Sequence, residues 1–282
     1  MEKLPRHKRT KDFQRMVLQA RDIGIVLSVY ENRFLRRDQI EKLFFKTTPT
    51  CNQRLQKFYQ HKFLDRIFQP VNFGSSKAVY ALDSVGAEVV AAKLGVGKRQ
   101  INWTRRHNNI EYLFLAHTLA VSELRVGLEL ALKFREEPDV KLLFWKREGL
   151  LPREKVQDPN NPEKKLSVIP DAFFGLETDR GKLFFFVEVD MGTETLDRFR
   201  TKIVAYKEYW KSGAFSKRYT YRNFRVLTVT NGVQRLNNLI ATADKTGTKN
   251  MFLFTIDRLA SSDFLGDSWY RPNSLDPISI LD

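Results

Sequence analysis

The chain has 282 residues, with 48 Lys and Arg against 33 Asp and Glu, so its formal net charge is +15. Its length favours two domains, and its 42% hydrophobic content excludes wholesale disorder. It has no apolar run of about 18 residues and no apolar segment after the basic N-terminus, so we predict neither a membrane span nor a secretory signal. A single cysteine excludes a disulfide framework and a cysteine-based zinc cluster. We expect a cytoplasmic, globular protein with a polyanionic partner.

The positive charge is concentrated in the first third of the chain. Residues 1–99 hold 20 Lys and Arg against 9 Asp and Glu, a net charge of +11, whereas the remaining residues carry only +4. Gly95 and Gly97 interrupt a helical pattern just before Arg99. We therefore predict one domain over residues 1–99 and a second over residues 100–282.

The first third has the pattern of a DNA-binding module. We predict helices over residues 13–34, 37–45, 48–62 and 84–94, and a β-hairpin of residues 64–68 and 78–82. Thr48 and Pro49 suit the N-cap and first position of the third helix, and Asp83 suits the N-cap of the last. This order is typical of a winged helix-turn-helix, whose third helix enters the DNA major groove. The alternative is a winged-helix module that contacts only proteins.

The third predicted helix has an apolar face of Cys51, Leu55, Phe58 and Tyr59, and its outward face, which includes Gln60, carries side chains suited to DNA. Gln53 and Arg54 can hydrogen-bond base edges, and Lys57 suits a phosphate. A basic N-terminal arm can add contacts that do not depend on base sequence. The expected DNA-binding residues are Thr50, Gln53, Arg54, Lys57, Lys77, Arg9 and Lys11.

The rest of the chain alternates between helical and strand patterns. We predict helices over residues 107–134, 194–211 and 233–245, and strands over residues 141–145, 167–176, 182–190, 224–230 and 251–256. The segment 152–165 is rich in turn residues and is predicted to be an exposed loop. Together these elements predict an α/β domain with a mixed sheet.

Three carboxylates fall on two neighbouring predicted strands. Asp171 lies in the second strand, and Glu188 and Asp190 close the third, where a period of two puts both on one face. Carboxylates from different strands are ligands that Mg²⁺ or Mn²⁺ prefers. Solvated residues at a strand end are the alternative, but residues 183–187 are apolar on both faces, which indicates a central strand and favours a functional site.

These residues carry a resemblance to two families. The strand order, with Pro170-Asp171 and Glu188, resembles the PD-(D/E)xK nuclease core and implies that Asp171 and Glu188 bind a metal ion. The nuclease lysine expected two residues after Glu188 is replaced by Asp190, and Lys202 is the candidate for its role. The winged-helix pattern and four further segments, over about residues 13–256, resemble the replication-relaxation family of plasmid and mobile-element proteins. The four segments are His117-Thr118-Leu119-Ala120-Val121, Ile169-Pro170-Asp171-Ala172, Glu188-Val189-Asp190-Met191-Gly192-Thr193-Glu194 and Lys202 with Tyr206.

The resemblance implies a bacterial DNA-binding accessory protein of plasmid or mobile-element replication or relaxation. Its implied partners are double-stranded DNA and relaxase or replication proteins, and a homodimer is compatible with it. One alternative is a Mg²⁺- or Mn²⁺-dependent DNA endonuclease with a degenerate Glu-x-Lys motif, using Asp171, Glu188, Asp190 and Lys202. Another is a transcriptional regulator whose second domain only assembles subunits. The run 217–225 interleaves cations and aromatic residues, which suits either nucleic acid or an ordinary loop.

Overall fold

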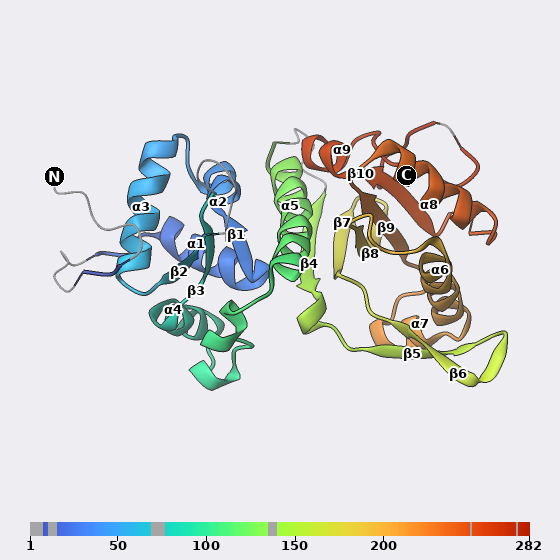
Figure 1. The fold of residues 1–282 in the computed structure, drawn as a ribbon, viewed down its shortest axis with the longest axis horizontal. Helices are drawn as coiled ribbons and strands as arrows, with labels where there is room; N and C mark the ends of the chain where they lie inside the picture. The colour runs from blue at the N-terminus through green and yellow to red at the C-terminus, as the bar shows by residue number, and fades with distance from the viewer. Residues whose placement is uncertain (1–7, 11–15, 69–76, 135–139, 249, 275) are drawn as a thin grey trace. The chain divides into compact units, whose positions relative to one another are not determined.

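The computed structural model describes residues 8–10, 16–68, 77–134, 140–248, 250–274 and 276–282. The chain divides into two compact units, residues 1–122 and 123–282 (Figure 1). The division falls inside helix α5 (Tyr112–Phe134), later than the predicted boundary at residue 99. The reason is that Leu115 and Leu119 of α5 pack with Phe34 and Val79 in the core of the first unit.

The first unit contains the predicted helices and hairpin strands, but its first helix begins at Ala20, so residues 16–19 of the predicted helix are not helical. Its elements are α1 (Ala20–Asn32), β1 (Phe34–Arg36), α2 (Arg37–Phe44), α3 (Thr48–Gln60), β2 (Leu64–Ile67), β3 (Val79–Leu82), α4 (Ser84–Leu94) and two short 3₁₀ turns, η1 (Lys98–Gln100) and η2 (Arg105–Asn108). Asp83 caps α4 as predicted, because its carboxylate accepts the Ser84 N–H at 2.6 Å. The strands form an antiparallel sheet in the order β1-β3-β2. Strand β1 was not predicted, since three residues are too few to show alternation.

Helix α3 packs its predicted apolar face into the first unit. Cys51, Leu55 and Phe58 are fully buried. Gln60, predicted to lie on the opposite face, is buried as well. Its side-chain oxygen accepts the Thr10 N–H at 3.1 Å, and its amide nitrogen donates to the Lys8 carbonyl oxygen at 3.3 Å. Residues 8–10 are therefore bound to the end of α3.

The second unit contains a mixed five-stranded sheet, as predicted. Its elements after α5 are β4 (Lys141–Arg147), η3 (Glu148–Leu150), β5 (Glu154–Asp158), β6 (Asn161–Val168), β7 (Ala172–Thr178), β8 (Gly181–Asp190), α6 (Leu196–Lys211), α7 (Ala214–Tyr219), β9 (Arg225–Thr230), α8 (Val233–Asp244), β10 (Phe252–Ile256) and α9 (Asp257–Ser262). The order is β10-β9-β8-β7-β4. Strands β8, β9 and β10 run parallel, whereas β4, β7 and β8 pair antiparallel. Strand β8 is therefore central.

Helices cover both faces of this sheet. Figure 1 shows α6 and α8 on one face, and α9 with the last turns of α5 on the other. Phe184 and Phe186 of β8 pack in one core cluster with Ile203 and Tyr206 of α6, whereas the ring of Phe185 stacks on Phe174 toward the opposite face. Among the described residues, no helix combines the length and the apolar composition that a membrane crossing requires.

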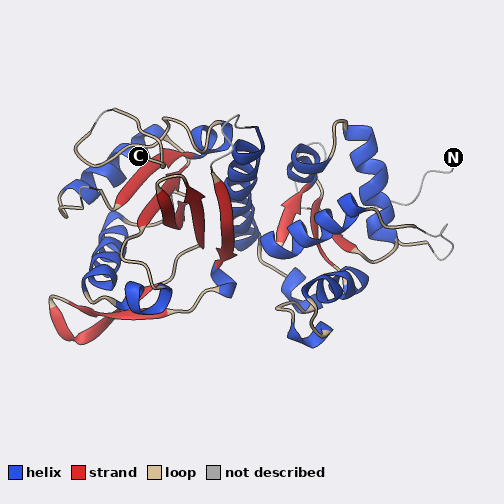
Figure 2. Cartoon of the chain, turned by 180° about the vertical axis from the view of Figure 1, so that it is seen from behind, coloured by secondary structure: helices blue, strands red, loops and turns tan. Residues whose placement is uncertain are grey.

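The prediction of an exposed loop over residues 152–165 is wrong, because strands β5 and β6 form an antiparallel hairpin there. Val156, Leu166 and Val168 alternate along the hairpin and are buried in the core cluster that contains α6. The charged residues on the other face hide this alternation in the sequence. Figure 2 shows the hairpin set apart from the five-stranded sheet.

The predicted strand over residues 167–176 is interrupted. Strand β6 ends at Val168 and β7 begins at Ala172, so Pro170 and Asp171 lie between two strands that belong to different sheets. Proline has no N–H to donate to a strand ladder, which explains a break at this point.

Candidate functional site

Asp171 and Glu188 form an acidic site at the edge of the sheet where β7 begins and β8 ends. The Asp171 N–H donates to the Val187 carbonyl oxygen at 3.0 Å, and its carboxylate accepts the Val189 N–H at 2.7 Å. Because these bonds flank Glu188 on β8, Asp171 is held beside it. Glu148 follows β4 at the same edge, and its N–H donates to the Asp171 carbonyl oxygen at 2.8 Å.

Helix α6 supplies two partners to the carboxylate of Glu188, a residue that is only 4% exposed. The Lys202 ammonium lies 2.9 Å from Oε2, and the Tyr206 hydroxyl donates to Oε1 at 2.6 Å. Lys202 and Tyr206 are four residues apart, so they share one side of the helix. Lys202, the helix lysine of the sequence prediction, thus contacts Glu188. Its ammonium also lies 3.2 Å from the Glu194 carboxylate.

The protonation of this group follows from burial and charge. Burial raises the pKa of Glu188 to about 7, with the Lys202 ammonium opposing the shift and the Asp171 carboxylate adding to it. Burial would lower the pKa of Lys202, but the attraction of Glu188 outweighs it, so the Lys202 pKa is raised and the ammonium stays charged. The site therefore holds a fixed cation next to a carboxylate that can take up a proton near neutral pH.

Asp190 lies on the same face of β8 as Glu188 but has different partners. Arg235 of α8 binds it in a bidentate manner, with Nε 2.6 Å from Oδ2 and Nη2 3.0 Å from Oδ1. The Thr230 hydroxyl donates to Oδ2 at 3.0 Å. Within the described ranges, no three His, Cys, Asp or Glu side chains are grouped so as to hold a metal ion. The structure therefore brings Asp171, Glu188 and Lys202 together and directs Asp190 to Arg235.

Sequence reasoning missed three of these contacts. In the sequence, Tyr206 and Glu194 stand out only as members of motifs, although the four-residue spacing of Lys202 and Tyr206 indicates that both side chains can reach one partner. Arg235 lies in the first turn of α8, after the carboxyl end of β9, but 45 residues separate it from Asp190. No local pattern marks that pair.

Most of the α3 side chains that are predicted to contact DNA are exposed, as expected. Thr50, Gln53 and Lys57 are exposed. The prediction that Arg54 projects outward with them is wrong. Its Nε donates to Asp22 Oδ1 at 2.9 Å, and its Nη2 contacts the other Asp22 oxygen and the Val17 carbonyl oxygen. Asp22 is fully buried, so Arg54 is held against α1.

The other predicted DNA-binding residues differ in their surroundings. Arg9 donates to the Asp83 carboxylate at 2.5 Å and to the Tyr59 carbonyl oxygen at 2.7 Å, so it is bound to the first unit and is not part of a free arm. Lys77 is 58% exposed and lies 2.9 Å from Asp38. Lys11 lies outside the described residues.

The Arg54→Ala variant tests the structural role of the pair with Asp22. Removing one partner leaves a buried charge, so we expect the free energy of unfolding to fall by about 3 kcal/mol. Urea denaturation followed by circular dichroism measures it. Lys57→Ala, on the exposed face of the same helix, is the matched control and should change stability by less than about 0.5 kcal/mol. Equal effects of the two variants would contradict the assignment.

The raised pKa of Glu188 predicts a pH dependence of stability. The folded chain holds this proton more tightly than the unfolded chain, so ionisation costs folding free energy as the pH rises from about 4.5 to about 7. We expect the stability of the wild type relative to Glu188→Gln to fall over this interval. Denaturant midpoints at several pH values measure the difference. Glu88→Gln, at an exposed carboxylate, is the control, and a difference independent of pH for Glu188→Gln would refute the prediction.

Comparison with known families agrees with the resemblance carried by the motifs. The replication-relaxation family model matches residues 27–224, more than half of the chain. The match includes α3, the β7–β8 edge and Lys202. No curated protein and no solved structure shows significant similarity to the chain. The chain belongs to the replication-relaxation family.

Proposed function

We propose that the protein is a DNA-binding accessory protein of plasmid or mobile-element replication or relaxation. Membership of the replication-relaxation family supports a role in these processes. The exposed polar face of α3, on a unit whose helices and β1-β3-β2 sheet follow the order of a winged helix, is the observation that carries the DNA-binding part. In this proposal the first unit locates a site on double-stranded DNA.

Helix α3 has the properties of a recognition helix. Thr50, Gln53 and Lys57 are spaced by three and four residues, so they form one stripe opposite the buried Cys51 and Leu55. Thr50 and Gln53 lie in the first turns, the part of such a helix that contacts base edges. Gln53 suits adenine, and Lys57 suits a phosphate. Because Arg54 is bound to Asp22, it is not among the proposed base contacts.

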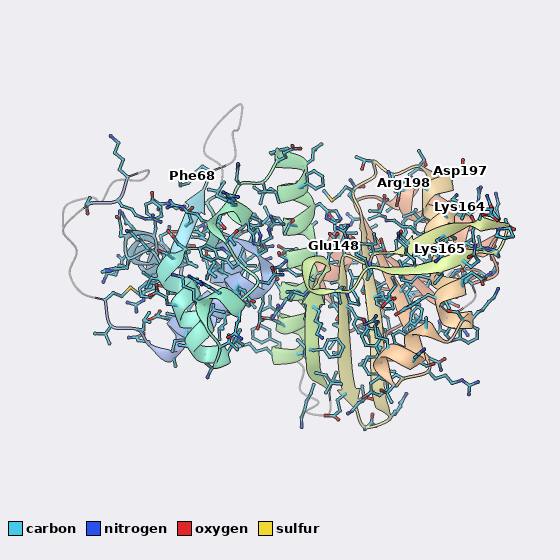
Figure 3. All side chains as sticks on the ribbon, turned by 90° about the horizontal axis from the view of Figure 1, so that it is seen from below. Phe68, Glu148, Lys164, Lys165, Asp197 and Arg198 are labelled. Carbon is cyan, nitrogen blue, oxygen red and sulfur yellow. The ribbon has the colours of Figure 1, made fainter. Side chains whose placement is uncertain are left out.

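The second unit is proposed to be a PD-(D/E)xK-like domain that engages DNA or a relaxase or replication protein. A helix, three strands, a helix and a strand follow one another in the order of that core, apart from the inserted β5–β6 hairpin and α7. Figure 3 shows Lys164 and Lys165 on the hairpin and Arg198 at the start of α6. Arg198 is 81% and Lys164 59% exposed, so these cations can reach a phosphate backbone.

A metal-dependent DNA endonuclease is the second candidate, favoured by the contact of Lys202 with Glu188. Proteins hold Mg²⁺ with one or two carboxylates plus waters and substrate phosphates, so Asp171 and Glu188 fit such an ion. When bound, Mg²⁺ or Mn²⁺ would polarise a phosphate and lower the pKa of a water. The Lys202 ammonium would stabilise negative charge that develops on the phosphate. Asp190 would remain with Arg235 and support the end of β8.

Lys57→Ala and Gln53→Ala test the proposed recognition helix. Loss of a phosphate contact should weaken binding to all duplexes and reduce the salt slope by about 1, whereas loss of a base contact should cost about 1–3 kcal/mol at the preferred site only. The preferred site is first selected from a random duplex library, and fluorescence anisotropy at several salt concentrations measures binding. Lys93→Ala, an exposed lysine on α4, is the control. If neither α3 variant changes duplex binding, the proposal that α3 is a recognition helix is wrong.

Incubation of supercoiled plasmid with the full chain and Mg²⁺ or Mn²⁺ separates the two candidates. The endonuclease predicts nicking that Asp171→Ala and Glu188→Ala abolish, while Asp179→Ala, at an exposed turn, retains it. The accessory role predicts tight DNA binding without nicking in either metal. Gel electrophoresis of the plasmid topoisomers measures the outcome.

A further inference from the structure

The second unit contains a pocket at the edge of the sheet opposite the acidic site. Its volume is about 450 Å³, and it lies where the parallel strands β8, β9 and β10 begin. Its lining includes Lys182, Phe184, Trp210, Asn223, Asn250 and Met251. This volume lies within the range of about 300–1,000 Å³ that is usual for small-molecule pockets. Neither the recognition helix nor the acidic site includes a residue of this pocket.

Aromatic side chains form one wall of the pocket. Trp210, near the end of α6, is 43% exposed, although most large aromatic side chains of this unit are buried. Its indole N–H donates to the Asn223 side-chain oxygen at 3.2 Å, which fixes the ring. Phe184 is covered on one side by Tyr221, with ring centroids 4.0 Å apart. A fixed, exposed indole is a surface on which a flat ring can stack.

Polar groups surround this aromatic wall. Asn223 accepts the indole N–H with its oxygen, so its NH₂ group is the part that can donate elsewhere, and Asn250 adds a second amide. Lys182 is 42% exposed, with its ammonium 3.9 Å from the Glu177 carboxylate. Arg222, adjacent to Asn223 in sequence, is exposed. Such a pocket suits a ligand that has a flat ring to stack, polar groups along the ring edge and a nearby anion. A nucleotide has all three of these features.

The pocket and the acidic site lie along the same helix and strand. Trp210 follows Lys202 by eight residues of α6, a rise of about 12 Å. Phe184 and Glu188 are on the same face of β8, about 13 Å apart along the strand. Core side chains fill the space between α6 and β8, where Phe186 packs against Tyr206 and Tyr209, so a ligand in the pocket does not reach the acidic site through it. Because Trp210 is exposed at the mouth of the pocket, a base held there can belong to a strand that continues over the surface of the unit or to a free nucleotide.

We propose that this pocket binds a base of single-stranded DNA, stacked on Trp210 with its phosphate near Lys182. The inference rests on the proposed function, because opened DNA is where a replication or relaxation protein meets a single strand. Within the run 217–225 it assigns a role to Asn223, which lines the pocket, and to Tyr221. Tyr221 supports Phe184, while Arg218 is paired with Glu154 and Arg225 donates to the Ile280 carbonyl oxygen at 2.8 Å.

Fluorescence anisotropy with a labelled 12-nucleotide oligothymidylate and the full chain tests the proposal. Trp210→Ala should weaken single-strand binding about tenfold, because one stacked base is lost, and Lys182→Ala should weaken it less. Trp210→Phe keeps a stacking surface and should retain most of the affinity. Lys211→Ala, the neighbouring helix lysine paired with Glu208, is the matched control. Thermal melts establish that each variant is folded.

Duplex binding separates failure of this inference from failure of the proposed function. Weaker single-strand binding by Trp210→Ala, with duplex binding unchanged and still sensitive to Lys57→Ala, supports the pocket. Single-strand binding that Trp210→Ala leaves intact, beside normal duplex binding, overturns the pocket alone. Competition by thymidine monophosphate as strong as that by the oligomer, or tighter binding of oligouridylate, overturns the single-stranded DNA assignment. A wild-type chain that binds neither duplex nor single strand overturns the proposed function as well.

Discussion

The edge where β7 begins and β8 ends depends on two hydrogen bonds of Asp171, one from its own N–H and one to its carboxylate. They fix the start of β7 against the end of β8, in the register that places Glu188 on the face covered by α6. A shift of one residue would turn Glu188 away from α6. Asp171 is thus both a carboxylate of the candidate site and the residue that positions the other one.

Burial of Glu188 is possible because α6 supplies a cation and a hydroxyl. A carboxylate taken out of water is costly, and an ammonium at 2.9 Å with a second hydrogen bond at 2.6 Å offsets that cost. The same contacts preorganise the site, since the lysine is in place before any phosphate arrives. They also mean that a metal ion would compete with Lys202 for the same carboxylate.

Local pattern was sufficient to predict most elements but not their partners. The Asp83 cap, the apolar face of α3 and the shared face of Glu188 and Asp190 follow from spacing alone. The contacts of Arg54 with Asp22 and of Arg235 with Asp190 join residues far apart in sequence, and composition cannot distinguish an exposed arginine from a buried ion pair. The β5–β6 hairpin was missed for a related reason. Its apolar residues lie on one face only, and the charged residues of the other face give the segment the composition of an exposed loop.

The first unit ends within helix α5, because the opening turns of this helix complete its core. Its early residues Leu115 and Leu119 pack on Phe34 and Val79, and the Ser122 hydroxyl donates to the Phe34 carbonyl oxygen at 2.9 Å. A fragment cut after residue 99, where the charge and the glycines suggest a boundary, would expose that apolar surface to water. A fragment intended to fold as the first unit needs the opening turns of α5. Recombination between family members would therefore preserve folding best if it exchanged the opening turns of α5 together with the β1-β3-β2 sheet.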